Sequence, residues 1–217
     1  MPGIAGLTVE QFQDKIKHFD QAYVRDWNAW CQALKAQQNV ASKFGEILRS
    51  WQACRPNRMR RTQQEAQHDP PFLENLIMQS NRYIEALQSF DIRGHAALND
   101  EACRALEQLW NIFQNLSYHG RARNGLAGIV GISKAVLLLT EGRVGPAFDS
   151  KVRGHLQILN LLNAQQWIDS LQIVSEDILA FEAANQCTLQ EAAPQAFADL
   201  HSGRIYDMAL WSSRIIR

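Results

Sequence analysis

Apolar residues recur every three or four positions along most of this chain, which is the period of an amphipathic α-helix. Three segments show the pattern most clearly, at residues 40–51, 102–116 and 167–181. No segment alternates apolar and polar residues in the way of a half-buried β-strand. The pattern therefore predicts an all-α protein of about nine or ten helices with little or no sheet.

Capping signals divide this pattern into separate helices. Thr8 with Gln11, and Thr188 with Glu191, match the capping box, in which two side chains satisfy the free N–H groups at a helix start. Asn99 is also expected to begin a helix, because a short polar side chain there accepts a hydrogen bond from the first turn. Each of these positions predicts a helix N-terminus.

Prolines and turn residues set the other expected boundaries. The first helix should run from Thr8 towards Tyr23, and the helix over 40–54 should end before Pro56, which disfavours helical geometry in the residue before it. Further helices are expected over 72–89, 132–140 and 150–162, the last of them capped by Asp149 or Ser150. Pro194 should break or kink the segment in which it lies.

The length and apolar content allow one sizeable core. The chain has 217 residues, of which 46% are hydrophobic. We expect a single all-helical domain over 1–217, with 1–66 and 67–217 as conceivable subdomains. The longest apolar run, 135–139, is too short to cross a bilayer, and the first residues lack the pattern of a secretory signal. We therefore expect a cytoplasmic protein that does not enter a membrane.

The charges and cysteines narrow the chemistry. There are 22 basic and 22 acidic side chains, so any attraction to nucleic acid must come from local patches. The four cysteines are widely spaced and form no CxxC pair, which predicts reduced thiols and no metal site. The phosphate-binding loop of ordinary kinases and the motifs of zinc proteases and α/β-hydrolases do not occur. We expect no cofactor.

One arginine cluster is a candidate phosphate contact. Arg55, Arg58, Arg60 and Arg61 lie within seven residues that contain no acid. Arginine grips phosphate oxygens with two parallel hydrogen bonds, so the cluster is a candidate nucleic-acid contact. A solvated loop is the alternative reading of the same residues.

An acid-free interval is the second candidate region. No acidic residue occurs between Glu107 and Glu141, an interval that contains Arg121, Arg123 and several glycines, among them Gly128 and Gly131. A glycine-rich connection that leads into a helix presents N–H groups to a phosphate. Close helix–helix packing explains such glycines equally well.

The residues from Gly128 through Lys134 to Thr140, the loop 142–148 and the sequence Asp149-Ser150-Lys-Val-Arg153 together resemble the core of the helix-hairpin-helix DNA glycosylase superfamily. In that family a glycine hairpin binds backbone phosphate, a following helix in some members carries a nucleophilic lysine, and an aspartate begins the next helix. The resemblance implies phosphate contacts by the hairpin, in which Ser133 stands where a glycine is expected. It implies catalytic roles for Lys134 and Asp149.

Two hypotheses follow. The first is a DNA-interacting protein with a glycosylase-like core, with or without base-excision activity. The second is a non-enzymatic helical interaction protein, in which Lys134 is a surface lysine and Asp149 only a helix cap. The first hypothesis requires both residues to face one cleft beside a basic surface.

Overall fold

Helices account for almost all of the regular structure of this protein. The computed structural model describes residues 3–54, 59–62, 64, 73–94, 98–117 and 125–211. Within these ranges there are ten α-helices and no sheet strand; Met59 and Ser117 form an isolated antiparallel bridge. The prediction of an all-α fold is confirmed.

The α-helices follow one another along the chain with two short 3₁₀ helices, η2 and η3, between them. In order they are α1 (Val9–Lys17), α2 (Gln21–Ala36), α3 (Val40–Ser50), α4 (Leu73–Ala86), α5 (Asp100–Phe113), η2 (Gln114–Leu116), α6 (Ile129–Leu139), α7 (Ser150–Leu156), α8 (Ala164–Asn185), α9 (Leu189–Ala192), η3 (Gln195–Phe197) and α10 (Ser202–Trp211).

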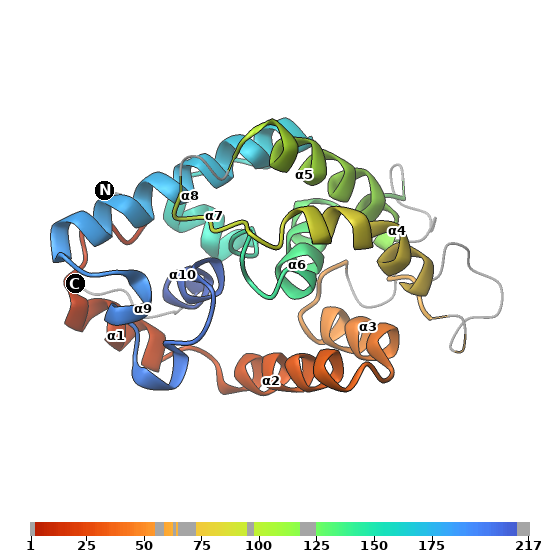
Figure 1. Cartoon of the computed structure of the whole chain (residues 1–217), viewed down its shortest axis with the longest axis horizontal. Helices are drawn as coiled ribbons and strands as arrows, with labels where there is room; N and C mark the ends of the chain where they lie inside the picture. The colour runs from red at the N-terminus through yellow and green to blue at the C-terminus, as the bar shows by residue number, and fades with distance from the viewer. Residues whose placement is uncertain are drawn as a thin grey trace.

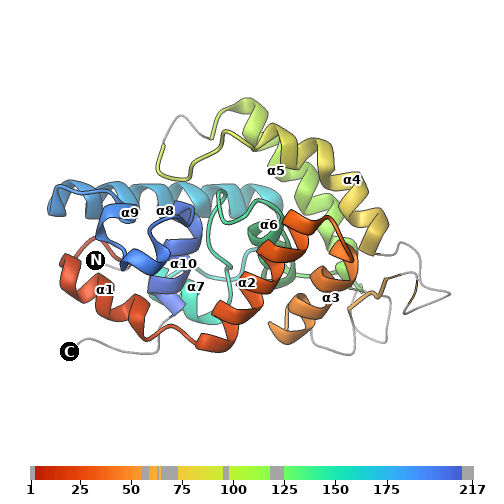
Figure 2. The ribbon, with the colours of Figure 1, turned by 60° about the horizontal axis from the view of Figure 1, so that its bottom comes forward.

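The helices are arranged in tiers around α6. Figure 1 shows α1, α2 and α3 along one side and α4, α5 and α8 along the other, with α6, α7 and α10 between them. The turned view in Figure 2 places α1 beside α9 and α10, so the two ends of the described chain pack together. Among the described helices, none is long and apolar enough to cross a membrane.

Three of the expected helix starts are confirmed. Thr8 and Thr188 each form a complete capping box. The Asn99 side chain accepts hydrogen bonds from the backbone N–H groups of Glu101 and Ala102. The helical segment is also interrupted at Pro194, as predicted: α9 ends at Ala192, and Pro194 precedes η3.

Several helix boundaries were predicted wrongly. The first helix ends at Lys17 instead of Tyr23, because the Asp20 side chain caps a new helix, α2. α6 begins at Ile129, three residues earlier than expected. α7 ends at Leu156, well before residue 162, because Gln157 adopts a left-handed conformation with φ 56°.

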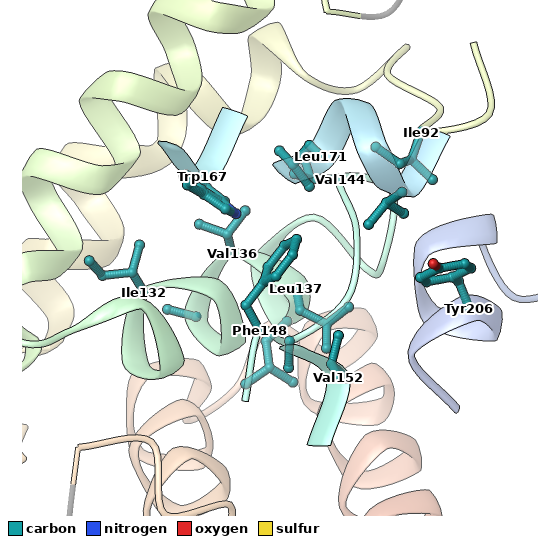
Figure 3. Packing of buried hydrophobic residues seen from close by; sticks show 14 of the residues in the cluster. Ile92, Ile132, Val136, Leu137, Val144, Phe148, Val152, Trp167, Leu171 and Tyr206 are labelled. Carbon is teal, nitrogen blue, oxygen red and sulfur yellow. The ribbon is translucent and has the colours of Figure 1, made fainter. Parts of the chain in front are cut away.

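Helix α6 forms the centre of the hydrophobic core. Nine of its eleven residues are buried, so neighbours surround it on nearly every side. Figure 3 shows Leu137 and Val136 of α6 close to Phe148 of the following loop, with Trp167 of α8 nearby. All these side chains are almost completely buried.

A buried carboxylate joins the N-terminal segment to this core. Asp177 on α8 accepts hydrogen bonds from the backbone N–H of Ile4 at 2.7 Å and of Ala5 at 3.0 Å. Its third partner is the hydroxyl of Tyr206 on α10, which donates at 2.7 Å. The first residues of the chain, α8 and α10 are therefore held at one point.

Candidate functional site

The N-terminus of α6 lacks a side-chain cap. Gly128 is its N-cap residue, and no side chain accepts a hydrogen bond from the first turn. A Cβ atom added to Gly128 would meet nothing within 4 Å. The first N–H groups of a helix have no partner inside the helix, so this end is open to an external acceptor.

Gly131, one turn later, has a different role. A Cβ atom there would lie 2.7 Å from the Cys54 Sγ and 3.1 Å from the Ala53 carbonyl oxygen. Only glycine lets α6 approach the turn that follows α3 so closely. Of the two glycines predicted to contact phosphate, Gly128 lies at an open position and Gly131 packs against this turn.

A cavity of about 490 Å³ lies at the start of α6. Its walls come from the segment after α3, from the residues before α6 and from the connection between α7 and α8, and none of them is acidic. The lining residues are Gln52, Ala53, Cys54, Ser117, Leu126, Ala127, Gly128, Ile129, Val130, Arg153, Asn160, Leu161 and Leu162.

Arg153 is the charged residue in this lining. Its guanidinium donates a hydrogen bond to the Asn160 side chain. Its Nε atom is buried and has no hydrogen-bond partner among the described residues. The cavity therefore combines an uncapped helix start with a cation, as an anion site does.

The predicted arginine contacts are only partly described. Arg60 is buried, and its Nε donates to the Asn115 carbonyl at 2.8 Å, so it ties its segment to η2 and does not offer a free surface. Arg61 is exposed. Arg55, Arg58, Arg121 and Arg123 lie outside the described residues.

Ser133 does not reach the molecular surface, contrary to its predicted role in nucleic-acid binding. Only 2% of the residue is exposed. Its hydroxyl donates to the Ile129 carbonyl at 2.7 Å and accepts from the Phe148 N–H at 2.9 Å. Ser133 thus fixes the loop before α7 against α6.

Lys134 is buried. The interpretation of Lys134 as a surface lysine is therefore wrong, and a catalytic Lys134 would have to act from inside the protein. The Lys134 Nζ donates a 2.6 Å hydrogen bond to the carbonyl of Trp51, at the C-terminal end of α3. A cation at that helix end is favourable. Burial lowers the pKa of Lys134, while the charges of Asp149 and Asp207 oppose this shift.

Asp149 caps α7, as its position after the loop predicted. Its Oδ1 accepts from the backbone N–H groups of Lys151 and Val152 at 2.9 and 3.1 Å. Its Oδ2 accepts from the Trp211 Nε1 at 2.9 Å, and the carboxylate is partly exposed. Both oxygens are therefore held in fixed directions.

Two charged residues of α10, Arg204 and Asp207, also lie near Lys134 and Asp149, and neither was predicted from the sequence. Asp207 pairs with the Arg204 Nη1 at 2.6 Å and accepts from the Ala147 N–H at 3.0 Å. Burial raises the pKa of Asp207 to about 6, although the Arg204 charge opposes the shift. An arginine and an aspartate three residues apart within an apolar run were the available signal.

The structure thus brings Lys134 and Asp149 close enough to interact electrostatically, with Asp207 beside them. The lysine is fixed inside the protein, whereas the aspartate keeps a partly exposed edge. Among the described residues, no group of three or more His, Cys, Asp or Glu side chains has a metal-binding arrangement.

Comparison with known proteins gives no further indication. No family model, no curated protein and no solved structure matches this chain.

Proposed function

We propose that this protein binds the phosphate backbone of DNA at the start of α6, as the helix-hairpin-helix resemblance implies. The observation that carries the proposal is the open, uncapped N-terminus at Gly128 inside a cavity without acidic lining residues. A phosphate there would accept from backbone N–H groups and lie near the Arg153 guanidinium.

The surroundings of the cavity support the same proposal. Exposed leucines border it, with Leu126 47% and Leu162 76% exposed. Met59 pairs with Ser117, a cavity residue, so the segment that carries exposed Arg61 runs close by. Apolar contacts beside cationic ones are common where proteins bind deformed or unpaired nucleic acid.

A substitution at Gly128 tests this directly. Gly128→Asp places a carboxylate where the phosphate would bind, yet aspartate is a favoured N-cap residue, so the fold should remain stable. Gly6→Asp is the matched control, because Gly6 also has open space around its Cβ position and lies outside the cavity. Both variants change the net charge equally.

The measurement is fluorescence anisotropy with a labelled DNA duplex and a labelled single strand at low ionic strength. We expect wild type and Gly6→Asp to bind with an affinity that falls as salt rises, and Gly128→Asp to bind at least about tenfold more weakly. Equal binding by all three proteins would reject phosphate contact at α6. No binding by wild type would instead favour a non-enzymatic helical interaction protein.

Base excision is a second, narrower candidate, and the fixed carboxylate of Asp149 favours it. An ionised carboxylate can stabilise the cationic transition state that forms when a base leaves its sugar. Lys134 supports this reaction less well as a nucleophile, because its amine is bonded to the Trp51 carbonyl. The version that the geometry supports best proceeds without a lysine–sugar imine.

Damaged and abasic duplexes provide the test. Wild type should release a base from at least one damaged duplex, and Asp149→Asn should lose that activity while keeping the helix cap. Borohydride should trap no protein–DNA adduct, since no imine forms. Full activity of Asp149→Asn would exclude the carboxylate mechanism, and a borohydride adduct lost in Lys134→Gln would restore the lysine mechanism.

A further inference from the structure

Exposed leucines gather at the cavity beside α6. Among the described residues, five large apolar side chains are exposed, and three of them lie there. Leu126 and Leu162 belong to the lining, and Leu159 is the chain neighbour of the lining residue Asn160. Leu159 is 86% exposed and Leu162 is 76% exposed. Apolar side chains gathered at one place on a surface are typical of a site that contacts a partner.

The connection between α7 and α8 holds two of these leucines in fixed positions. The Ile158 N–H donates to the Arg153 carbonyl at 2.9 Å, and the Leu162 N–H donates to the Gln166 side chain at 2.8 Å. Leu161, between the two exposed leucines, is buried in the core. The leucines are thus presented by an anchored backbone, which loses little conformational freedom when a partner binds.

The chain segments that build this cavity carry no negative charge. They come from residues 47–64, 108–140 and 150–168, and none of these three ranges contains an aspartate or a glutamate. Arg153 adds a positive charge to the lining, and the uncapped start of α6 lies beside it. A suitable partner therefore combines negative charge with apolar faces. A nucleic-acid strand has both, in its phosphates and its bases.

A duplex does not offer its apolar faces to such a surface. Its bases are stacked on one another and its charged phosphates lie outside, so exposed leucines pressed against it would desolvate charge without gaining apolar contact. In an unpaired strand the base faces are free, and apolar side chains such as leucine can pack on them. The cavity volume of about 490 Å³ lies within the ~300–1,000 Å³ of sites that hold drug-sized ligands, which is the size class of one nucleoside.

We infer that this site prefers an unpaired DNA strand to a duplex, because Leu159 and Leu162 contact the faces of unstacked bases. The inference rests on the proposed phosphate binding at α6 and adds base contacts to it. Every base has a flat apolar face, so these contacts do not depend on the base sequence.

Three labelled DNA ligands of equal length separate the bases from the phosphates. They are a mixed-sequence single strand, a strand of stable abasic nucleotides that keeps all the phosphates, and a duplex. Binding to the full chain is measured by fluorescence anisotropy at low ionic strength. We expect the base-bearing single strand to bind about tenfold more tightly than either of the others, as contact with one or two bases allows.

Paired substitutions show whether the leucines are responsible. Leu159→Ser combined with Leu162→Ser should weaken binding of the base-bearing strand about five- to tenfold and change binding of the abasic strand less than about twofold. Met78→Ser combined with Ile173→Ser is the matched control, because both residues are exposed and apolar but lie outside the cavity lining. Gly128→Asp should instead weaken both strands alike. Circular dichroism verifies that each variant is folded.

The outcomes distinguish this inference from the phosphate site on which it rests. Equal binding of the base-bearing and abasic strands, or equal effects of the leucine pair and the control pair, would overturn the base contacts and leave phosphate binding in place. Tighter binding of the duplex would overturn the preference. No binding of any DNA would overturn both proposals.

Two other partners of the leucines are tested with the same variants. Binding to vesicles that contain an anionic phospholipid is measured by co-sedimentation, and self-association is measured by analytical ultracentrifugation. We expect the leucine pair to change neither. Suppose the leucine pair abolishes one of them and leaves the single-strand affinity unchanged. The leucines then form a membrane or self-association surface, and the inference is wrong.

Discussion

The start and the middle of helix α6 lie in opposite environments, although they are only a few residues apart in one short stretch. At the start of the helix, Gly128 borders an open cavity and the first turn has no side-chain cap. A few residues later, Ser133 and Lys134 are buried, and their side chains form hydrogen bonds to the carbonyl groups of Ile129 and Trp51 and to the Phe148 N–H. The first region is arranged for an external ligand, and the second holds the protein together.

The difference shows that residues which together resemble a binding motif can have different roles, one open to a ligand and the others in internal packing. The glycosylase-like stretch assigned phosphate contact to Gly128, Gly131 and Ser133 together. The structure leaves only Gly128 of these three at an open surface. Gly131 allows close packing on Cys54, and Ser133 anchors Phe148. Each residue of the stretch therefore needs its own test.

The buried region should respond most strongly to substitution. Asp207→Ala leaves the Arg204 guanidinium buried without its partner, so we expect the free energy of unfolding to fall by about 3–5 kcal/mol. Chemical denaturation measures this loss. The double variant Arg204→Met with Asp207→Leu, which removes both charges, should recover much of it. A loss below about 1 kcal/mol in Asp207→Ala would show that the ion pair is unimportant.

The two glycines offer a matched comparison between the regions. Gly131→Ser should destabilise the fold by about 1–3 kcal/mol, because its side chain overlaps the Cys54 and Ala53 atoms. Gly128→Ser makes the same chemical change at an open N-cap position, where serine is favoured, and should alter stability by less than about 0.5 kcal/mol. Thermal unfolding of both variants measures the two losses of stability. Equal losses would contradict the distinction between the two glycines.

The pH dependence of stability should report the buried carboxylate. The pKa of Asp207 is raised from 3.8 to about 6, so the folded state binds a proton more tightly than the unfolded chain. The contribution of this carboxyl to the free energy of unfolding is therefore fully present below pH 4. It is lost as pH rises towards 6, at no more than about 1.4 kcal/mol per pH unit. Unfolding of wild type and Asp207→Asn from pH 4 to 7 provides the measurement. Parallel curves would show that Asp207 titrates normally.

The smallest expected effect concerns the open region. Arg153→Gln removes one cation from the cavity wall and should weaken DNA binding a few-fold, lowering the slope of log affinity against log salt by about 1. Arg25→Gln, an exposed arginine of α2, removes the same charge outside the cavity. Anisotropy titrations at several salt concentrations distinguish the two. An unchanged slope in Arg153→Gln would place the phosphate contacts elsewhere.

The sequence by itself determined the helical class of the protein and four of the helix starts. Periodic apolar residues and capping side chains act over one or two turns, so Thr8, Asn99, Asp149 and Thr188 were identifiable without knowledge of the fold. The start of α2 at Asp20 was missed although its signal is local too, because the apolar pattern continues across the break at residues 18–20.

The environment of each charged side chain was decided only by the tertiary structure. Lys134 lies on a helix that could expose it, and it is buried because the end of α3 supplies the Trp51 carbonyl 83 residues away in sequence. The pairing of Asp149 with Trp211 and the cavity at the start of α6 likewise join segments that are distant along the chain. Local periodicity carries no information about which helix faces pack against each other. That packing decides whether a charge or a hydrogen-bond donor is buried and whether it has a partner, and these two conditions set its free energy.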